Sequence, residues 1–155
     1  MHKMRRSDRQ MVEHEIYELL ESSDIIRIGV IAEEKPYIVP VNFICLNDVI
    51  YFHSAKAGRK VTALEEAREV CFEVDELIAI KHEDKACKFS CYYKSIIGYG
   101  QPFLVDGPDK ADILNSLTQK YTTKKFEPVS AGDAQHVVVY GIKITSVCGK
   151  KNIPH

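Results

Sequence analysis

Long apolar runs are missing from this 155-residue sequence. None approaches the ~20 residues that a membrane-spanning helix needs, so we expect no membrane association. The first ten residues are basic and polar, and no apolar stretch follows them. We therefore expect no secretory signal peptide, and both absences favour a cytoplasmic protein.

Several motifs that carry chemistry are also missing. The sequence contains no Gly-x-Gly-x-x-Gly, no Gly-x-x-x-x-Gly-Lys-Ser/Thr and no Gly-x-Ser-x-Gly. It therefore shows no standard dinucleotide fold, nucleotide-hydrolase loop or hydrolase elbow. The five cysteines form no Cys-x-x-Cys pair, and Cys87 and Cys91 would lie ~13 Å apart on an extended strand. We expect reduced thiols and no metal site.

Charge of one sign is not in excess either. The chain has 21 Lys and Arg against 22 Asp and Glu, a formal net charge of −1. No global field would recruit nucleic acid or an anionic membrane. The apolar share of 45% and the charged share of 28% are ordinary for a soluble globular protein. The length fits one domain, residues 1–155, with a real hydrophobic core.

What is present is mostly strand-like. Apolar periodicity predicts helices over residues 8–21, 57–67 and 109–121, and strands over residues 25–32, 36–45, 49–54, 70–74, 89–105 and 137–147. Ser7 or Asp8 offers an N-cap oxygen to the first helix. About six strands with few interrupting helices suggest a mainly β fold, a closed or partly closed antiparallel barrel with flanking helices.

Local signals refine this prediction. Asn47-Asp48 is a good tight hairpin turn, so the first three strands are expected to form an antiparallel meander. Gly98 and Gly100 indicate a bend or bulge within a long strand, as barrel corners need. Residues 76–85 are charged but interrupted by Leu77, Ile78 and Ile80, and this pattern predicts no element.

The most informative segment runs from Tyr51 to Lys60. A strand ends, a turn of small residues follows and a helix opens. The Ser54 hydroxyl, the free N–H groups of the helix start and the cations Lys56, Arg59 and Lys60 would suit a phosphate. A solvated basic turn is the alternative interpretation. His53, directly before this turn, suits a hydrogen-bonded core residue, a ligand contact or an acid–base group.

Two further segments could contact a ligand. Pro36 and Pro40 lie four residues apart in one strand, so that strand should be an edge strand with free backbone groups. Such groups could pair with a flavin ring, although an edge strand without ligand fits as well. Tyr93, Ser95 and Ile97 share one strand face, which suits a ring-stacking wall or ordinary barrel filling.

Taken together, these segments resemble one known family. The segments are Met4-Arg5-Arg6-Ser7-Asp8-Arg9, Pro36-Tyr37-x-x-Pro40-x-Asn42-Phe43, Tyr51-Phe52-His53-Ser54-Ala55-x-x-Gly58-Arg59-Lys60, Val70-Cys71-Phe72-Glu73-Val74, Tyr93-Lys94-Ser95-Ile96-Ile97-Gly98-Tyr99-Gly100 and Gly149-Lys150. In this order they resemble the nitroimidazole-resistance branch of the pyridoxamine 5′-phosphate oxidase-like flavoproteins. The resemblance covers nearly the whole chain.

The resemblance implies an FMN-binding split β-barrel that works as a homodimer with flavin sites at the subunit interface. FMN is the usual flavin, and some relatives hold FAD. Carried over by position, the ring would be lined by Val39, Pro40, Val41 and Asn42. The ribityl-phosphate end would be held by His53, Ser54, Ala55, Arg59 and Lys60. Tyr93 and Ser95 match a flavin-contacting motif that can come from the other subunit, and Lys150 is a weaker candidate.

The resemblance leaves several functions open. The first is an oxidoreductase that reduces a small aromatic, such as a nitro compound, with His53 as the catalytic residue. The second is a flavin carrier or sensor without turnover, and the third is haem binding. The chain ends at Lys151-Asn152-Ile153-Pro154-His155 and lacks the C-terminal arginine–histidine signature of a true pyridoxamine-phosphate oxidase. This departure argues against vitamin B6 oxidation.

Overall fold

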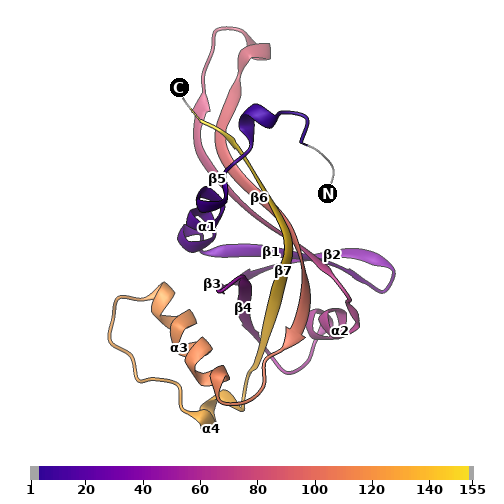
Figure 1. Cartoon of the computed structure of the whole chain (residues 1–155), viewed down its shortest axis with the longest axis vertical. Helices are drawn as coiled ribbons and strands as arrows, with labels where there is room; N and C mark the ends of the chain where they lie inside the picture. Colours follow the sequence, from indigo (N-terminus) through magenta and orange to yellow (C-terminus); the bar gives the residue numbers. More distant parts are fainter. Residues whose placement is uncertain (1–3, 154–155) are drawn as a thin grey trace.

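A computed structural model describes residues 4–153 of the chain (Figure 1). Its strands are β1 (Ile25–Ala32), β2 (Lys35–Asn42), β3 (Ile44–Leu46), β4 (Val49–Ser54), β5 (Val70–Lys81), β6 (Ser90–Leu104) and β7 (Val138–Asn152). Its α-helices are α1 (Glu13–Ser22), α2 (Arg59–Glu66), α3 (Asp109–Tyr121) and α4 (Ala131–Ala134). No helix over the described residues is long and apolar enough to cross a membrane.

All seven strands belong to one antiparallel sheet, in the order β2-β1-β5-β6-β7-β4-β3. The sheet curls so far that β2 and β4 approach each other without forming a ladder. The predicted mainly β, partly closed barrel with flanking helices is therefore confirmed. The barrel is split where β2 faces the end of β4, because Phe52–Ser54 pair only with β7.

The predicted meander of three strands is wrong. The strand expected over residues 36–45 breaks at Phe43 into β2 and β3, which lie at opposite edges of the sheet. β2 pairs only with β1, as expected of a strand that contains Pro36 and Pro40. Each hairpin turn places two residues at positive φ, Glu33-Glu34 and Asn47-Asp48, and the second turn was predicted.

The first helix begins later than predicted, and neither Ser7 nor Asp8 caps it. Residues Ser7–Arg9 form a short 3-10 turn, and the backbone N–H of Met11 then donates to the Gly149 carbonyl at 2.9 Å. This pairing with β7 holds the segment extended until Val12, whose N–H donates to Glu15 Oε2 at 3.0 Å. The carboxylate of Glu15 thus closes the first turn of α1.

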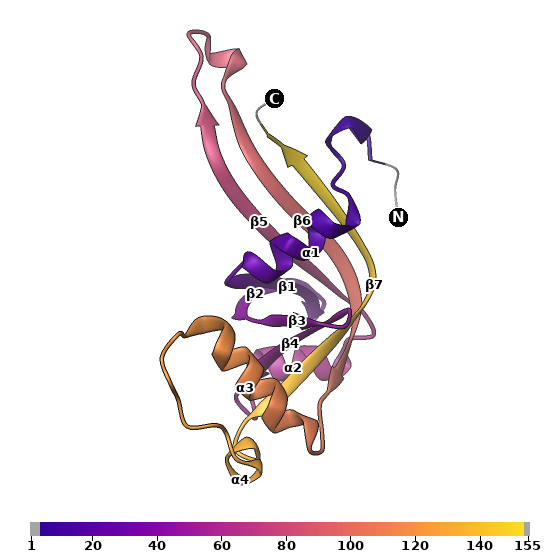
Figure 2. The ribbon, with the colours of Figure 1, turned by 60° about the vertical axis from the view of Figure 1, so that its left-hand side comes forward.

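The strands β5, β6 and β7 extend beyond the barrel as a curved arm (Figures 1 and 2). β5 includes much of the segment that predicted no element, and it pairs with β6 from Val70–Gly100 out to Lys81–Ser90. The β6–β7 register shifts between Tyr99 and Gly100, which confirms the bulge predicted near Gly98 and Gly100. β7 is likewise longer than predicted and ends at Asn152.

Two apolar cores result from this arrangement. The main core fills the barrel and centres on Phe43, Phe52, Phe72 and Ile142, all fully buried. The second core lies outside the barrel wall, where α3 and α4 cover the β4–β7 surface (Figure 2). It joins Ile113 and Leu114 of α3 to Val139 of β7.

Candidate functional site

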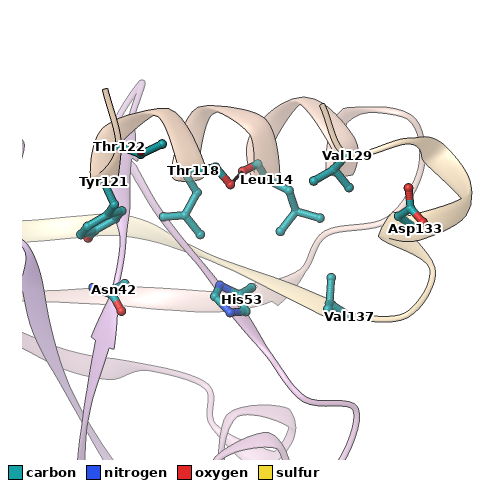
Figure 3. Close-up of a pocket in the computed structure, with 10 residues that line it drawn as sticks. Asn42, His53, Leu114, Thr118, Tyr121, Thr122, Val129, Asp133 and Val137 are labelled. Atoms are coloured by element: carbon teal, nitrogen blue, oxygen red, sulfur yellow. Dashed lines mark hydrogen bonds between the residues drawn. The ribbon is translucent and has the colours of Figure 1, made fainter. Parts of the chain in front are cut away.

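A groove beneath α3 continues from the edge of this second core. Its volume is about 620 Å³, within the range of small-molecule sites. Its walls come from β2, β4, α3, the loop after α3, α4 and the residue directly before β7 (Figure 3). The lining residues are Asn42, His53, Leu114, Leu117, Thr118, Tyr121, Thr122, Val129, Asp133 and Val137.

His53 and Asn42 meet in this groove, although they lie on different strands. Along β4 the side chains of Phe52 and Ser54 point into the barrel core, so His53 between them points outward beneath α3. Asn42 is the last residue of β2, and its side-chain amide donates to the Asp24 carbonyl at 3.2 Å. The groove thus spans the split between β2 and β4.

Two residues at the end of α3 fix the helix over the groove. The Lys120 ammonium donates to the Ser23 carbonyl at 2.7 Å and to the Leu20 carbonyl at 3.3 Å, where α1 leaves its last carbonyls unpaired. It also lies 3.9 Å from the Phe43 ring centroid. Burial lowers the pKa of Lys120. The two carbonyl oxygens and the Phe43 ring replace the water that an exposed ammonium would contact.

Tyr121 explains why the strand breaks at Phe43. Its hydroxyl accepts a hydrogen bond from the Phe43 N–H at 2.8 Å and donates to the Asp24 carbonyl at 2.6 Å. The Phe43 carbonyl also lies 3.0 Å from this hydroxyl. The N–H of Phe43 is therefore satisfied by a side chain and not by a neighbouring strand, and burial raises the pKa of Tyr121.

The cations predicted to hold phosphate lie at the start of α2. The Arg59 guanidinium stacks over the Tyr37 ring at 4.6 Å and lies 3.8 Å from a Glu33 carboxylate oxygen. Lys60 is half-buried beside the Phe52 ring, and burial alone lowers the pKa of its ammonium. Among residues 4–153 no carboxylate forms an ion pair with Lys60, and a partly desolvated cation of this kind fits a bound anion.

The backbone before α2 also leaves room for a ligand. Gly58 is the N-cap of α2 and has φ of 125°, a conformation that favours glycine. A Cβ placed there would meet no atom within 4 Å, so the space next to the first turn is open. With the free N–H groups of the helix start, these residues fit the phosphate end of a flavin nucleotide.

The other predicted contacts divide by the direction of their side chains. Three of them have side chains that point into the barrel, namely Val39, Val41 and Ser54, and Ser54 is 5% exposed. A ligand on the outer surface could therefore contact only their backbone groups. Pro40 and Ala55 are exposed on the surface. The unpaired edge of β2 leaves its backbone groups available, as predicted for the ring site.

Tyr93 and Ser95 lie on β6, where it pairs with Leu77 and Asp75 of β5, and no residue of β6 lines the groove. Ser95 pairs with Lys150 of β7, and the Lys150 ammonium lies 6.0 Å from the Tyr93 ring centroid. The structure therefore brings these three predicted residues together with each other. It does not bring them to His53 within one chain.

Much of the groove escaped prediction from the sequence. The helical spacing of Leu114, Leu117 and Tyr121 placed them on one side of a helix but carried no hint of a ligand. Thr118, Val129 and Asp133 had no signal at all, since their role depends on how α3 and α4 dock. Over residues 4–153, no group of three or more His, Cys, Asp or Glu side chains is placed to hold a metal ion.

Comparison with protein families gives one match over most of the chain. The sequence profile described as pyridoxamine 5′-phosphate oxidase matches residues 12–151. None of the proteins with curated functions matches the sequence.

Solved structures share the fold. A candidate 5-nitroimidazole antibiotic resistance protein from Bacteroides thetaiotaomicron is 24% identical with a TM-score of 0.78, covering 91% of this chain and 85% of its own. A flavocytochrome from Azotobacter vinelandii is 22% identical with a TM-score of 0.86, covering 99% and 73%. An FAD and haem binding protein from Mycobacterium smegmatis is 16% identical with a TM-score of 0.84, covering 95% and 76%. At these identities the likeness establishes the fold.

Proposed function

The chain belongs to the pyridoxamine 5′-phosphate oxidase family, and from this premise we propose that it is a flavin-dependent oxidoreductase that reduces small aromatic compounds, nitro compounds among them. The observation that carries the proposal is the split in the barrel. One end of the split carries the uncompensated Lys60 at the start of α2, and the other opens into the groove that holds His53.

The proposed cofactor is FMN. Arg59, Lys60 and the N–H groups at the start of α2 would hold its phosphate. The free backbone edge of β2 from Val39 to Asn42 would hold the ring edge. Solved structures of this fold include proteins described as FAD-binding, so FAD is the alternative flavin. Identifying the nucleotide released from the protein by mass spectrometry separates the two.

Bound flavin would supply the electron transfer, and the protein would supply binding, orientation and protons. His53 faces the groove, and its imidazole carries ring nitrogens that can donate to a ligand atom beside it. The aliphatic side chains of Leu114, Leu117 and Val129 would exclude water from an aromatic acceptor beside it. We therefore assign His53 as the proton donor to the acceptor.

The absorption spectrum of the purified protein tests the proposal. We expect a yellow protein with flavin bands, in which a reduced nicotinamide nucleotide supplies electrons and the flavin reoxidises when a nitroaromatic is added. A protein that is colourless and binds neither FMN nor FAD would contradict it. Flavin binding without turnover would instead favour a carrier or sensor. A Soret band would favour haem, which one protein of this fold binds according to its description.

His53→Ala should separate chemistry from binding. We expect turnover with a nitroaromatic acceptor to fall by about 10²-fold or more, the usual contribution of a general acid, while flavin content stays unchanged. The matched control is His14→Ala, which removes an exposed imidazole from α1. Turnover that survives His53→Ala intact would show that His53 is not catalytic.

We further propose that two copies form a homodimer in the cytoplasm, with each arm completing the flavin site of the other. The arm exposes Leu77, Ile80, Phe89 and Ile97, each at least 44% exposed in the single chain. Exposed apolar side chains of this size favour an interface. This would bring Tyr93 and Ser95 to the partner's flavin. Light scattering should give twice the 17.6 kDa chain mass, and a monomer would contradict the proposal.

A further inference from the structure

The groove beneath α3 contains one fixed charge, and that charge is negative. Asp133 is the only Asp, Glu, Lys or Arg among its lining residues over the described part of the chain. Ser130 donates its hydroxyl to Asp133 Oδ2 at 2.5 Å and its backbone N–H to the same oxygen at 3.3 Å. These hydrogen bonds lower the pKa of Asp133, so its carboxylate is ionised at neutral pH.

Most other polar groups of the groove are already committed to the protein. Asn42 and Tyr121 both donate to the Asp24 carbonyl, and the Thr118 hydroxyl donates to the Leu114 carbonyl at 2.9 Å. Groups with a partner gain little by exchanging it for a ligand atom. They therefore define the shape of the groove and contribute little to recognition of a charged ligand.

His53 differs from these groups. In Figure 3 it lies below Thr118 and Leu114, and no hydrogen bond links it to any other residue drawn. Its imidazole is thus available to one polar atom of a ligand. The wall also includes the aliphatic side chains of Leu114, Leu117 and Val129. An apolar ligand with one polar group, placed at His53, would match this surface.

The start of α2 and the α4 end of the groove therefore favour opposite charges. Lys60 and Arg59 favour an anion at the start of α2, whereas Asp133 disfavours one at the α4 end of the groove. We propose that the groove beneath α3 binds the electron acceptor, and that it selects uncharged or cationic aromatic molecules and rejects anions, phosphate esters included. That the ligand is the electron acceptor rests on the proposed function, whereas the charge selection rests on the groove alone.

Three ligands that share one ring and one nitro group test this selection. They are 4-nitrobenzylamine, 4-nitrobenzyl alcohol and 4-nitrobenzoate, which are cationic, neutral and anionic at neutral pH. Binding is measured by NMR titration of the isotope-labelled protein, with and without added flavin. We expect shifts at Thr118, Val129 and Val137, and benzoate binding weaker than amine binding by about three- to tenfold, as one exposed charge interaction allows.

Asp133→Asn should abolish this difference, because the amide removes the charge and keeps an oxygen that can accept from Ser130. The matched control is Asp112→Asn, which neutralises an exposed carboxylate of α3 outside the groove and should preserve the difference. Equal binding of benzoate and amine to the native protein would overturn the charge selection. The charge selection would also be overturned if the Asp133→Asn protein still bound benzoate more weakly than the amine.

Thr118→Trp tests the location without relying on charge. The indole should fill the groove and reduce binding of all three ligands by at least tenfold, while Gln119→Trp on the exposed face of α3 should not. Ligand shifts that map elsewhere would overturn the site. The visible spectrum is recorded on the same samples. A colourless protein that binds the ligands in the groove contradicts only the flavin proposal, and a yellow protein that does not bind them contradicts only this one.

Discussion

Lys60→Ala is expected to weaken flavin binding by about 10- to 150-fold. The ammonium lies half-buried in the first turn of α2, and burial alone lowers its pKa. A charge-assisted hydrogen bond to a phosphate is worth ~1.5–3 kcal/mol, which gives this range of affinity. Fluorescence titration of flavin-free protein with FMN measures it.

Removal of the Lys60 charge should weaken flavin binding but should not destabilise the flavin-free protein. A lysine whose pKa is lowered by folding destabilises the folded state while it is charged, at pH values below the folded pKa. This penalty disappears only as the pH rises through the unfolded pKa near 10.4. At neutral pH, Lys60→Met removes the charge and keeps the aliphatic stem beside Phe52. The Tm of the flavin-free protein should therefore rise or stay constant.

Lys143→Ala is the matched control, since it removes an exposed cation from β7 and changes the net charge equally. It should leave FMN affinity unchanged. If Lys60→Ala binds FMN as tightly as the native protein, the start of α2 is not the phosphate site. If Lys60→Met lowers the Tm of the flavin-free protein, then Lys60 serves the fold and not the ligand.

The parts of the site that could be predicted from sequence are local in the chain. The residues from Ser54 to Lys60 follow one another through a strand end, a turn and a helix start, so their proximity needs no knowledge of the fold. β1 and α3 were predicted with the bounds that the structure has, because each has a clear apolar period and a polar boundary. Patterns of this kind depend only on residues that are close in the sequence, so they can be recognised without knowledge of the fold.

The parts that were missed depend on contacts between distant segments. Between Val41 and Cys45 only Asn42 is polar, and the segment contains neither Gly nor Pro, so no strong local signal marks the break. The break exists because the Tyr121 hydroxyl, 78 residues away, bonds to the backbone of Phe43. The groove follows from the same docking of α3.

The arm shows a second reason for failure. Beyond Val74 the side chains of β5 are exposed on both faces in the single chain, so its sequence has no alternation between apolar and polar residues. Period-2 patterns report a strand with one buried face, and this strand lacks one. No strand was therefore predicted over residues 76–85, although β5 pairs with β6 from Val70 to Lys81.

Gly98→Ala is expected to lower the free energy of unfolding by about 3 kcal/mol, at the upper end of the usual range for overpacking. Gly98 of β6 pairs with Phe72 of β5, and the Phe72 ring covers it. A Cβ at Gly98 would lie 2.2 Å from Phe72 Cζ and within 2.8 Å of two more ring atoms. Phe72 is 0% exposed, so the ring has no space into which it could move.

Gly141→Ala supplies a control with the same local geometry and a different environment. A Cβ there would also lie 2.2 Å from a phenylalanine Cζ, that of Phe103. Phe103 is 41% exposed, so its ring can swing toward solvent and the loss should stay below about 1 kcal/mol. Urea unfolding of both variants, with the slope m checked for constancy, measures the two losses.

A double substitution identifies the cause of the larger loss. Phe72→Leu shortens the side chain above Gly98, so Gly98→Ala should destabilise the Phe72→Leu protein by much less than it destabilises the native one. The coupling free energy between the two positions should then exceed about 1 kcal/mol, as expected of residues in contact. Equal losses at Gly98 and Gly141, or additive effects of Gly98→Ala and Phe72→Leu, would show that burial of the opposing ring does not control the tolerance of these glycines.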